Sequence, residues 1–153
     1  MVLKQYSAYL LLERGLTENT RQSYLNDVAK LISYLNDNNL SLKEVTLDTL
    51  HNFIAELHDL GISPRSQARI ISGIKSFFRF LKLENHIEHN PSLLLESPRI
   101  GRKLPEVLSI DEIDNMISCI DLSTTEGQRN RAIIETLYSC GLRVSELVNL
   151  KLN

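Results

Sequence analysis

Residues 64–83 read PRSQARIISGIKSFFRFLKL, and they point to the fold class of this 153-residue chain. The apolar side chains recur at three- and four-residue steps, the spacing of one face of an α-helix. They are Ile70, Ile71, Ile74, Phe77, Phe78 and Leu81. Ser63 can serve as N-cap and Pro64 as first helical residue, where its missing N–H loses no hydrogen bond. The stretch therefore predicts an amphipathic helix with a broad apolar face.

The opposite face of this predicted helix is basic. Every charged residue between Asp59 and Glu84 is a lysine or an arginine. These residues are Arg65, Arg69, Lys75, Arg79 and Lys82. At about 100° per residue, they fall within a sector of roughly 140°. Such a face suits a DNA phosphate backbone, whereas the alternative is a solvated surface with acidic partners elsewhere in the fold.

Other segments repeat the helical period. Helices are predicted at about residues 3–14, 18–36, 46–60 and 90–95. Gly15 and Gly61 are placed to end two of them, and Thr17 is placed as an N-cap. No run of alternating β-branched residues precedes the C-terminal end. The sequence therefore predicts an all-α fold.

The composition, 42% hydrophobic and 24% charged, excludes collagen-like and disordered classes. No segment approaches the roughly 20 uninterrupted apolar residues of a membrane span, and no cleavage site follows the apolar start. These features predict a cytoplasmic protein without membrane association. The formal net charge of −2 argues against a generally basic coat, so the basic face is a local feature.

No cofactor or metal is predicted. Cys119 and Cys140, the two cysteines, lie within apolar helical patterns and are expected to be buried free thiols. His86 and His89 stand three residues apart, but the neighbouring Pro91 favours a surface loop over a metal site. Four tyrosines are expected to be buried or half-buried. They are Tyr6, Tyr9, Tyr24 and Tyr34.

Residues 97–105, SPRIGRKLP, have no apolar period and combine two prolines, one glycine and three basic residues. We predict a linker over residues 98–107. It would join a domain of residues 1–97 to a second part, residues 108–153.

The second part also begins with a helix signal. Ser109 and Glu112 have capping-box spacing, a helix is predicted at about residues 126–139, and Gly141 is placed to end it. A last helical turn is predicted at about residues 144–150. A part of this length seldom buries a stable core alone, so the chain is expected to end inside a domain.

Arg143 occupies a junction between two of these elements. It follows the helix that Gly141 ends and precedes another helical turn, so its backbone is held on rigid elements. Glu146, three residues on, can orient its side chain. On spacing alone, a surface Arg–Glu pair explains the arrangement equally well.

The residues around Arg143 resemble a known motif. GLRVSEL, residues 141–147, preceded by Arg131-Ala132 and an apolar helix, closely resembles the first conserved box of the tyrosine site-specific recombinases, in particular the bacterial Xer recombinases. LTENT, residues 16–20, followed by Tyr24 and Asp27, resembles the second helix of that family's N-terminal core-binding domain. Further matches are Leu31, Asn90-Pro91, Leu104-Pro105 and Leu108-Ser109.

Several catalytic residues of the family have no counterpart in this sequence. They are the lysine on a β-hairpin, the His-x-x-Arg box, a further histidine or tryptophan, and the C-terminal tyrosine nucleophile. Tyr138 precedes the box, so it is not carried over as the nucleophile. The chain is therefore expected to be inactive alone.

The resemblance implies a SAM-like core-binding helical domain followed by the first helices of a truncated catalytic domain. It also implies that the full-length parent is an enzyme. Such enzymes cut and rejoin DNA through a 3′-phosphotyrosyl intermediate without metal, ATP or cofactor, for chromosome-dimer resolution or integration. Arg143 would be the first of two catalytic arginines, and Glu146 would support it.

The implied partners are a double-stranded DNA recombination site and other recombinase subunits, in a homo- or hetero-tetramer on DNA. Besides the five cations of residues 64–83, five residues are expected to face the duplex. They are Arg21, Lys30, Arg99, Arg102 and Lys103. Two alternatives stay open: a non-catalytic helical DNA-binding module, and a protein-interaction module whose binding persists at high salt.

Overall fold

The computed structural model describes residues 2–101, 104 and 106–151. Its regular elements over these residues are all α-helices, which confirms the predicted class. The helices are α1 (Val2–Leu12), α2 (Glu18–Asp37), α3 (Leu47–Asp59), α4 (Pro64–Leu83), α5 (Ile110–Ser118), α6 (Thr125–Cys140) and α7 (Val144–Val148). They form two compact units, Met1–Arg102 and Lys103–Asn153, which we call the first and second unit.

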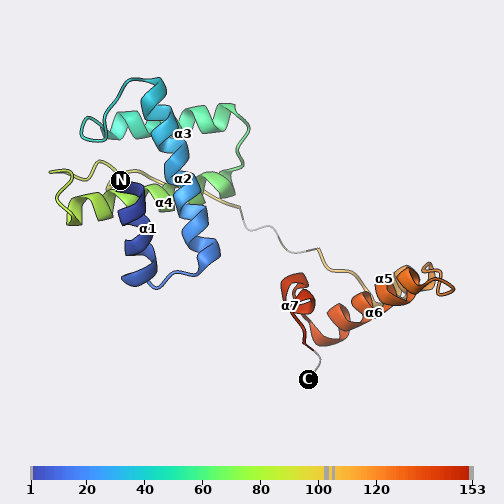
Figure 1. Cartoon of the computed structure of the whole chain (residues 1–153). Helices are drawn as coiled ribbons and strands as arrows, with labels where there is room; N and C mark the ends of the chain where they lie inside the picture. The colour runs from blue at the N-terminus through green and yellow to red at the C-terminus, as the bar shows by residue number, and fades with distance from the viewer. Residues whose placement is uncertain (1, 102–103, 105, 152–153) are drawn as a thin grey trace. The chain divides into compact units, whose positions relative to one another are not determined.

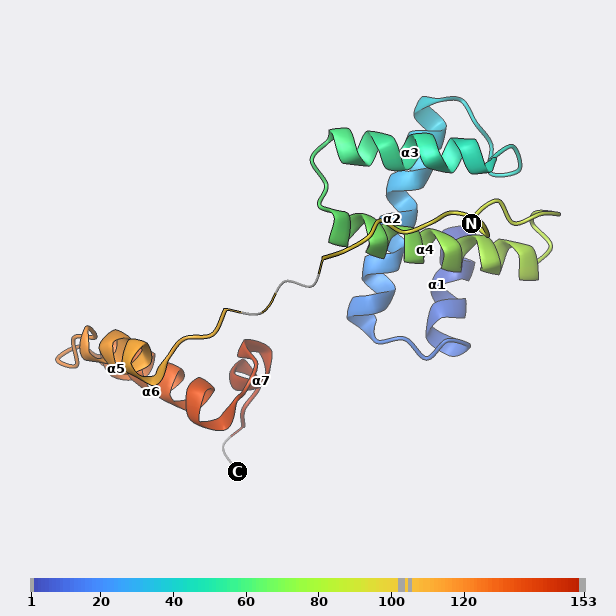
Figure 2. The same cartoon turned by 180° about the vertical axis from the view of Figure 1, so that it is seen from behind.

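Helix α4 is the central element of the first unit. The most extensive contact between helices joins it to α2, and α1 and α3 also pack against it. Figures 1 and 2 show α2 running across both α3 and α4. All four helices therefore contribute to one core, which the apolar face of α4 fills.

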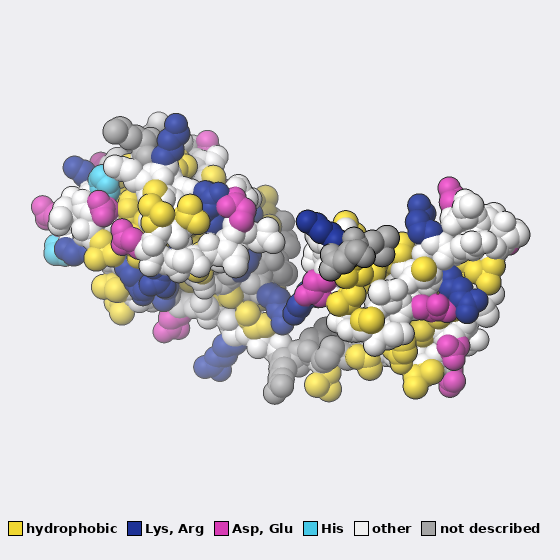
Figure 3. Space-filling view, turned by 60° about the horizontal axis from the view of Figure 1, so that its bottom comes forward, with side chains coloured by type: hydrophobic (Ala, Val, Ile, Leu, Met, Phe, Trp, Pro, Cys, Tyr) yellow, Lys and Arg dark blue, Asp and Glu magenta, His cyan; other side chains and the backbone are white. Residues whose placement is uncertain are grey.

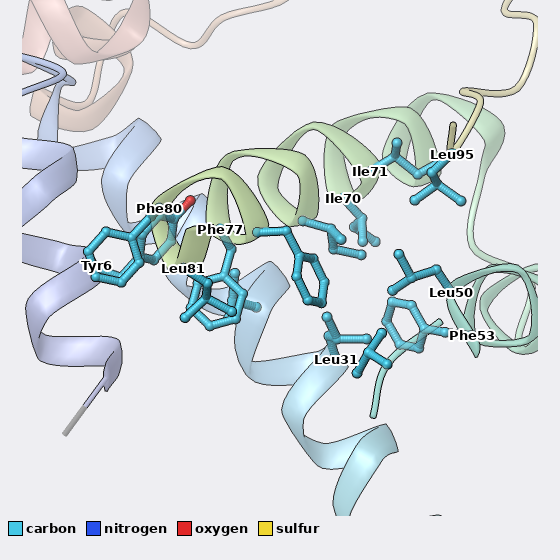
Figure 4. Packing of buried hydrophobic residues seen from close by; sticks show 14 of the residues in the cluster. Tyr6, Leu31, Leu50, Phe53, Ile70, Ile71, Phe77, Phe80, Leu81 and Leu95 are labelled. Carbon is cyan, nitrogen blue, oxygen red and sulfur yellow. The ribbon is translucent and has the colours of Figure 1, made fainter. Parts of the chain in front are cut away.

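Aromatic rings fill the part of this core next to α1. Phe77 is fully buried, and its ring centre lies 5.1 Å from that of Tyr6 and 5.9 Å from that of Phe78. Figure 4 shows aliphatic side chains continuing the core along α4. The tyrosines pack as predicted: Tyr6 and Tyr9 are buried, and Tyr24 and Tyr34 are half-buried against the core.

Local capping sets where the helices begin. The side-chain oxygens of Thr17, Thr46 and Ser63 accept hydrogen bonds from the backbone N–H three residues on, at the starts of α2, α3 and α4. Ser109 and Glu112 form the predicted capping box of α5, in which Glu112 Oε2 accepts from the Ser109 backbone N–H at 2.8 Å. Both ends of α4 match the prediction from the sequence.

The prediction of a short helix at Asn90–Leu95 is wrong, because this segment forms a turn. Asn90 Oδ1 accepts hydrogen bonds from the Ser92 backbone N–H at 2.9 Å and from the Ser92 hydroxyl at 2.8 Å. An asparagine that bonds the backbone two residues on competes with helix formation. Pro91 therefore begins a turn instead of a helix.

The second unit buries little of its apolar surface. Ile113 is its one buried large apolar side chain among the described residues. Its exposed large apolar side chains are Leu104, Val107, Leu108, Ile110, Met116, Leu122, Ile133, Tyr138, Val144, Val148 and Leu150. Figure 3 shows hydrophobic side chains spread over the visible face of this unit. Residues 106–151 thus contain no core like that of the first unit.

The prediction that the two cysteines are buried is also wrong. Cys119 and Cys140 are free, but both are exposed. Cys119 directly follows α5 and Cys140 ends α6, in a unit with few buried side chains. An apolar helical pattern marks a face that can be buried, whereas burial itself needs a partner surface.

The described residues of the predicted linker, namely 98–101, 104, 106 and 107, have no regular secondary structure. Gly141 ends α6 as predicted, with a φ of 60°, a conformation that glycine adopts without strain. The last helix ends at Val148, two residues before the predicted end. Over the described residues, no helix combines the length and the hydropathy that spanning a bilayer requires.

Candidate nucleic-acid interface

The basic face of α4, which we define as Arg65, Arg69, Lys75, Arg79 and Lys82, is largely open to solvent. Lys75 is half-buried and the other four are exposed. Arg65, Lys75 and Arg79 form no ion pair within the described part of the chain. Lys82 forms none either, so four positive charges without an ion-pair partner among the described residues stand on one helix.

Part of the basic face lines a shallow groove where α1, α2 and α4 meet. The groove is lined by Tyr9, Arg14, Leu16, Tyr24, Ser72, Lys75, Ser76 and Arg79. Arg14 follows α1 and adds a third cation to Lys75 and Arg79. Cations and hydroxyl groups are the side chains that most often contact DNA phosphates, so the groove has the chemistry of a phosphate site.

Arg69 differs from its neighbours on the basic face because it has an acidic partner. Its Nη1 donates to Oδ2 of Asp27 on α2 at 2.5 Å. Asp27 is fully buried, whereas the Arg69 side chain is 44% exposed. Burial raises the pKa of Asp27 above its ordinary value, although the Arg69 guanidinium beside it acts in the opposite direction. Among the five residues of the basic face, Arg69 is therefore the one for which the structure describes an acidic partner from another part of the fold.

On α2, the two residues expected to face DNA lie in different surroundings. The Arg21 guanidinium bonds the Glu18 carboxylate at 2.5 Å and the Ser7 hydroxyl at 2.5 Å, and its side chain is only 23% exposed. Its charge is therefore largely compensated within the first unit. Lys30 is exposed, and its charge lies close enough to Asp27 to favour the ionised carboxylate.

The remaining predicted contacts lie near or after the end of α4. The Lys82 ammonium donates to the backbone carbonyl oxygen of Glu88, which fixes the side chain but leaves its charge uncompensated. Arg99 is exposed in a segment without regular structure. Arg102 and Lys103 lie outside the described residues.

Arg143 stands at the N-cap of α7 in the second unit, and its side chain is 82% exposed. Its Nη1 donates to Glu146 Oε1 at 3.0 Å, and its backbone N–H donates to Glu146 Oε2 at 2.7 Å. One carboxylate thus holds both the backbone and the guanidinium of Arg143, which is the orienting contact that the three-residue spacing predicts. The rest of the guanidinium is free to bind an anion from solvent.

Analysis of the sequence missed two residues of this interface. Arg14 is the last residue of the helix predicted at residues 3–14, but α1 ends at Leu12, so Arg14 lies in the connection to α2. Asp27 did leave a signal, because it stands three residues after Tyr24 and four before Leu31, within the apolar stripe of α2. An acid at a stripe position predicts a buried carboxylate with a basic partner on the facing helix.

Comparison with known proteins identifies the family. Residues 3–85 match the phage integrase N-terminal SAM-like domain, and the chain belongs to this family. The likeness to Xer recombinases is confirmed by relatives named "Tyrosine recombinase XerD". The chain is 40% identical to that of Pseudomonas putida over 152 residues, which cover 99% of this chain and 51% of the relative. It is 41% identical to that of Rickettsia bellii, again over 152 residues, covering 99% of this chain and 50% of the relative.

The chain therefore spans about half the length of the curated relatives that it matches. One solved structure, "Integrase from mycobacterium phage Brujita", matches 94% of this chain and 46% of its own with a TM-score of 0.57. The sequence identity to it is 16%, so this likeness supports the fold alone.

Proposed function

We propose that this chain is the DNA-binding N-terminal part of a tyrosine site-specific recombinase of the Xer type. The observation that carries the proposal is the set of cations on α4 that lack an ion pair within the described residues, with Arg14 beside two of them in one groove. Like charges this close repel each other unless an anion compensates them. The phosphates of duplex DNA form a polyanion that can do so along the whole helix.

The reaction that we propose for the parent enzyme is transesterification at a DNA phosphodiester. A tyrosine hydroxyl attacks the phosphorus and loses its proton, and the bond from phosphorus to the 5′ oxygen breaks. The 5′ oxygen takes up a proton to become a hydroxyl, and the 3′ phosphate stays esterified to the tyrosine. A 5′-hydroxyl of a partner strand then attacks this ester and releases the tyrosine. Each step exchanges one phosphate ester for another, so no external energy source is needed.

In this reaction Arg143 stabilises the charge that develops on the phosphoryl oxygens. Its planar guanidinium can bond both non-bridging oxygens, which a lysine cannot match geometrically. The Glu146 carboxylate, 3.0 Å from Nη1, limits the rotamers of Arg143 before DNA arrives. Glu146 is a positioning residue in this account.

We place the parent enzyme in the cytoplasm, on a double-stranded recombination site, with other recombinase subunits in a homo- or hetero-tetramer. The names of the relatives support a recombinase of the Xer type. The process that we propose for it is the resolution of chromosome dimers for chromosome partition in the cell cycle. Integration of mobile DNA is the second process that the same chemistry serves.

The proposal is tested by the salt dependence of DNA binding. With about four phosphates neutralised, the logarithm of the affinity should fall against the logarithm of salt concentration with a slope near −3.6, at about −0.9 per contact. Fluorescence anisotropy of a labelled duplex, titrated with the 153-residue chain at several salt concentrations, measures this slope. A slope near zero would refute the DNA interface and favour a protein-interaction module.

The chain alone should form no covalent adduct with DNA. Among the catalytic residues implied by the family, it carries only Arg143, and one arginine without a nucleophile cannot open a phosphodiester. A nicked suicide substrate, incubated with the chain and resolved on a denaturing gel, gives the readout. A protein–DNA adduct would show that a residue of this chain, such as Tyr138, is the nucleophile after all.

A further inference from the structure

The contact between α2 and α4 contains a buried carboxylate that the proposed function does not yet use. Asp27 is 0% exposed, and its Oδ2 accepts from Arg69 Nη1 at 2.5 Å. Its other oxygen, Oδ1, has no hydrogen-bond partner among the described residues. The only hydrogen bond that the described residues give the buried Asp27 carboxylate is therefore the one from Arg69 of the basic face.

The position of this carboxylate depends on Gly73, which lies one turn after Arg69 on α4. A Cβ atom at Gly73 would lie 3.2 Å from Asp27 Oδ2 and 3.3 Å from Asp27 Cβ, closer than most such contacts. The Gly73 carbonyl oxygen also accepts a hydrogen bond of 3.4 Å from the Tyr6 hydroxyl of α1. The absence of a side chain at residue 73 therefore lets the Asp27 carboxylate lie directly against α4 beside Arg69.

Stability is a weak explanation for this ion pair. Burial raises the pKa of Asp27 despite the guanidinium beside it, so the loss of hydration outweighs the attraction. The Arg69 side chain is 44% exposed, and solvent screens its half of the pair. The pair does fix geometry, because a buried carboxylate packed against Gly73 has little freedom to move.

We infer that Asp27 is a positioning residue for Arg69 at the DNA interface. It holds one edge of the Arg69 guanidinium at the α2–α4 contact and leaves the remaining N–H donors for a DNA phosphate. A guanidinium fixed before binding loses less rotamer freedom when it meets the phosphate. This inference rests on the proposed function, since it concerns how the same face binds DNA.

A positioning role and simple electrostatics predict opposite changes in DNA affinity for Asp27→Asn. Removing a negative charge beside a DNA-binding face should tighten binding if charge alone matters. If Asp27 positions Arg69, the same substitution should weaken binding by about tenfold. Asp37→Asn is a matched control, because Asp37 is exposed at the end of the same helix.

A double-mutant cycle separates positioning from a general structural role. Asp27→Asn should weaken DNA binding in the wild-type chain and have no further effect in the Arg69→Ala background. Arg69→Lys keeps the charge but loses the planar fork, so it should also weaken binding, whereas a pure charge role predicts no change. Urea unfolding of each variant shows that it is folded and that affinity does not simply follow stability.

The measurement is anisotropy of a labelled duplex of mixed sequence at about 50 mM salt, where phosphate contacts contribute most. Binding of Asp27→Asn that is as tight as wild type or tighter would overturn the positioning role. So would an equal loss in the Arg69→Ala background. Both results leave the proposed function standing as long as the affinity of the wild-type chain for DNA falls steeply with salt concentration. A wild-type chain without that salt dependence refutes the proposed function and this inference together.

Discussion

Phe77→Ala should lower the free energy of unfolding of the first unit by about 3–5 kcal/mol, the range for truncating a buried phenylalanine. Phe77 is fully buried, and its ring packs edge-on against Tyr6 of α1 and against Phe78. The substitution leaves a cavity where α1 meets α4, the helix that every other helix of the first unit contacts. A loss of this size is a large part of the stability of an ordinary domain.

Urea unfolding followed by tyrosine fluorescence measures this loss, because four of the five tyrosines lie in the first unit. Leu83→Ala is the control. Leu83 ends the same helix but is 60% exposed, so its removal should change the stability by less than about 0.5 kcal/mol. Equal losses for the two variants would mean that α4 is not the centre of the core.

Local signals in the sequence predicted the helices well. The ends of α4 follow from Ser63, Pro64 and an unbroken apolar period, all of which act within a few residues. The same holds for the capping box of Ser109 and Glu112. The wrong prediction of a helix at Asn90 also has a local cause. The Asn90 side chain accepts a hydrogen bond from the Ser92 backbone N–H, an interaction that competes with helix formation and that helical propensity alone does not describe.

Burial and pairing were harder to predict because both need a second element. Cys119 and Cys140 lie in apolar patterns, yet both are exposed, since little in the second unit covers them. The sequence places five cations on one face of α4, but it does not show that Asp27 compensates Arg69 from another helix. It likewise gives no hint that Arg14 joins Lys75 and Arg79 in a groove, because Arg14 follows α1 whereas the other two residues lie on α4.

Replacing Arg65, Lys75 and Arg79 together by alanine should weaken binding to duplex DNA by about two orders of magnitude at about 50 mM salt. These side chains lack ion pairs within the described residues, so their loss leaves no buried charge unpaired. Arg69 is kept because Asp27 depends on it. Alanine is the best helix former, so α4 should remain intact, which circular dichroism checks.

A second triple variant controls for net charge. Lys4→Ala, Lys43→Ala and Arg129→Ala remove the same charge from exposed positions outside the basic face. If only the overall charge mattered, both triple variants would lose affinity equally. If the basic face binds the duplex, the control should stay close to wild type.

The salt slope of the Arg65, Lys75 and Arg79 triple variant tests the central claim most directly, because it counts phosphate contacts independently of absolute affinity. Loss of three contacts should flatten the slope of log affinity against log salt by about 2.7, while the control variant keeps the wild-type slope. A triple variant whose slope equals that of wild type would contradict the account, since the basic face of α4 would then make no contact with DNA.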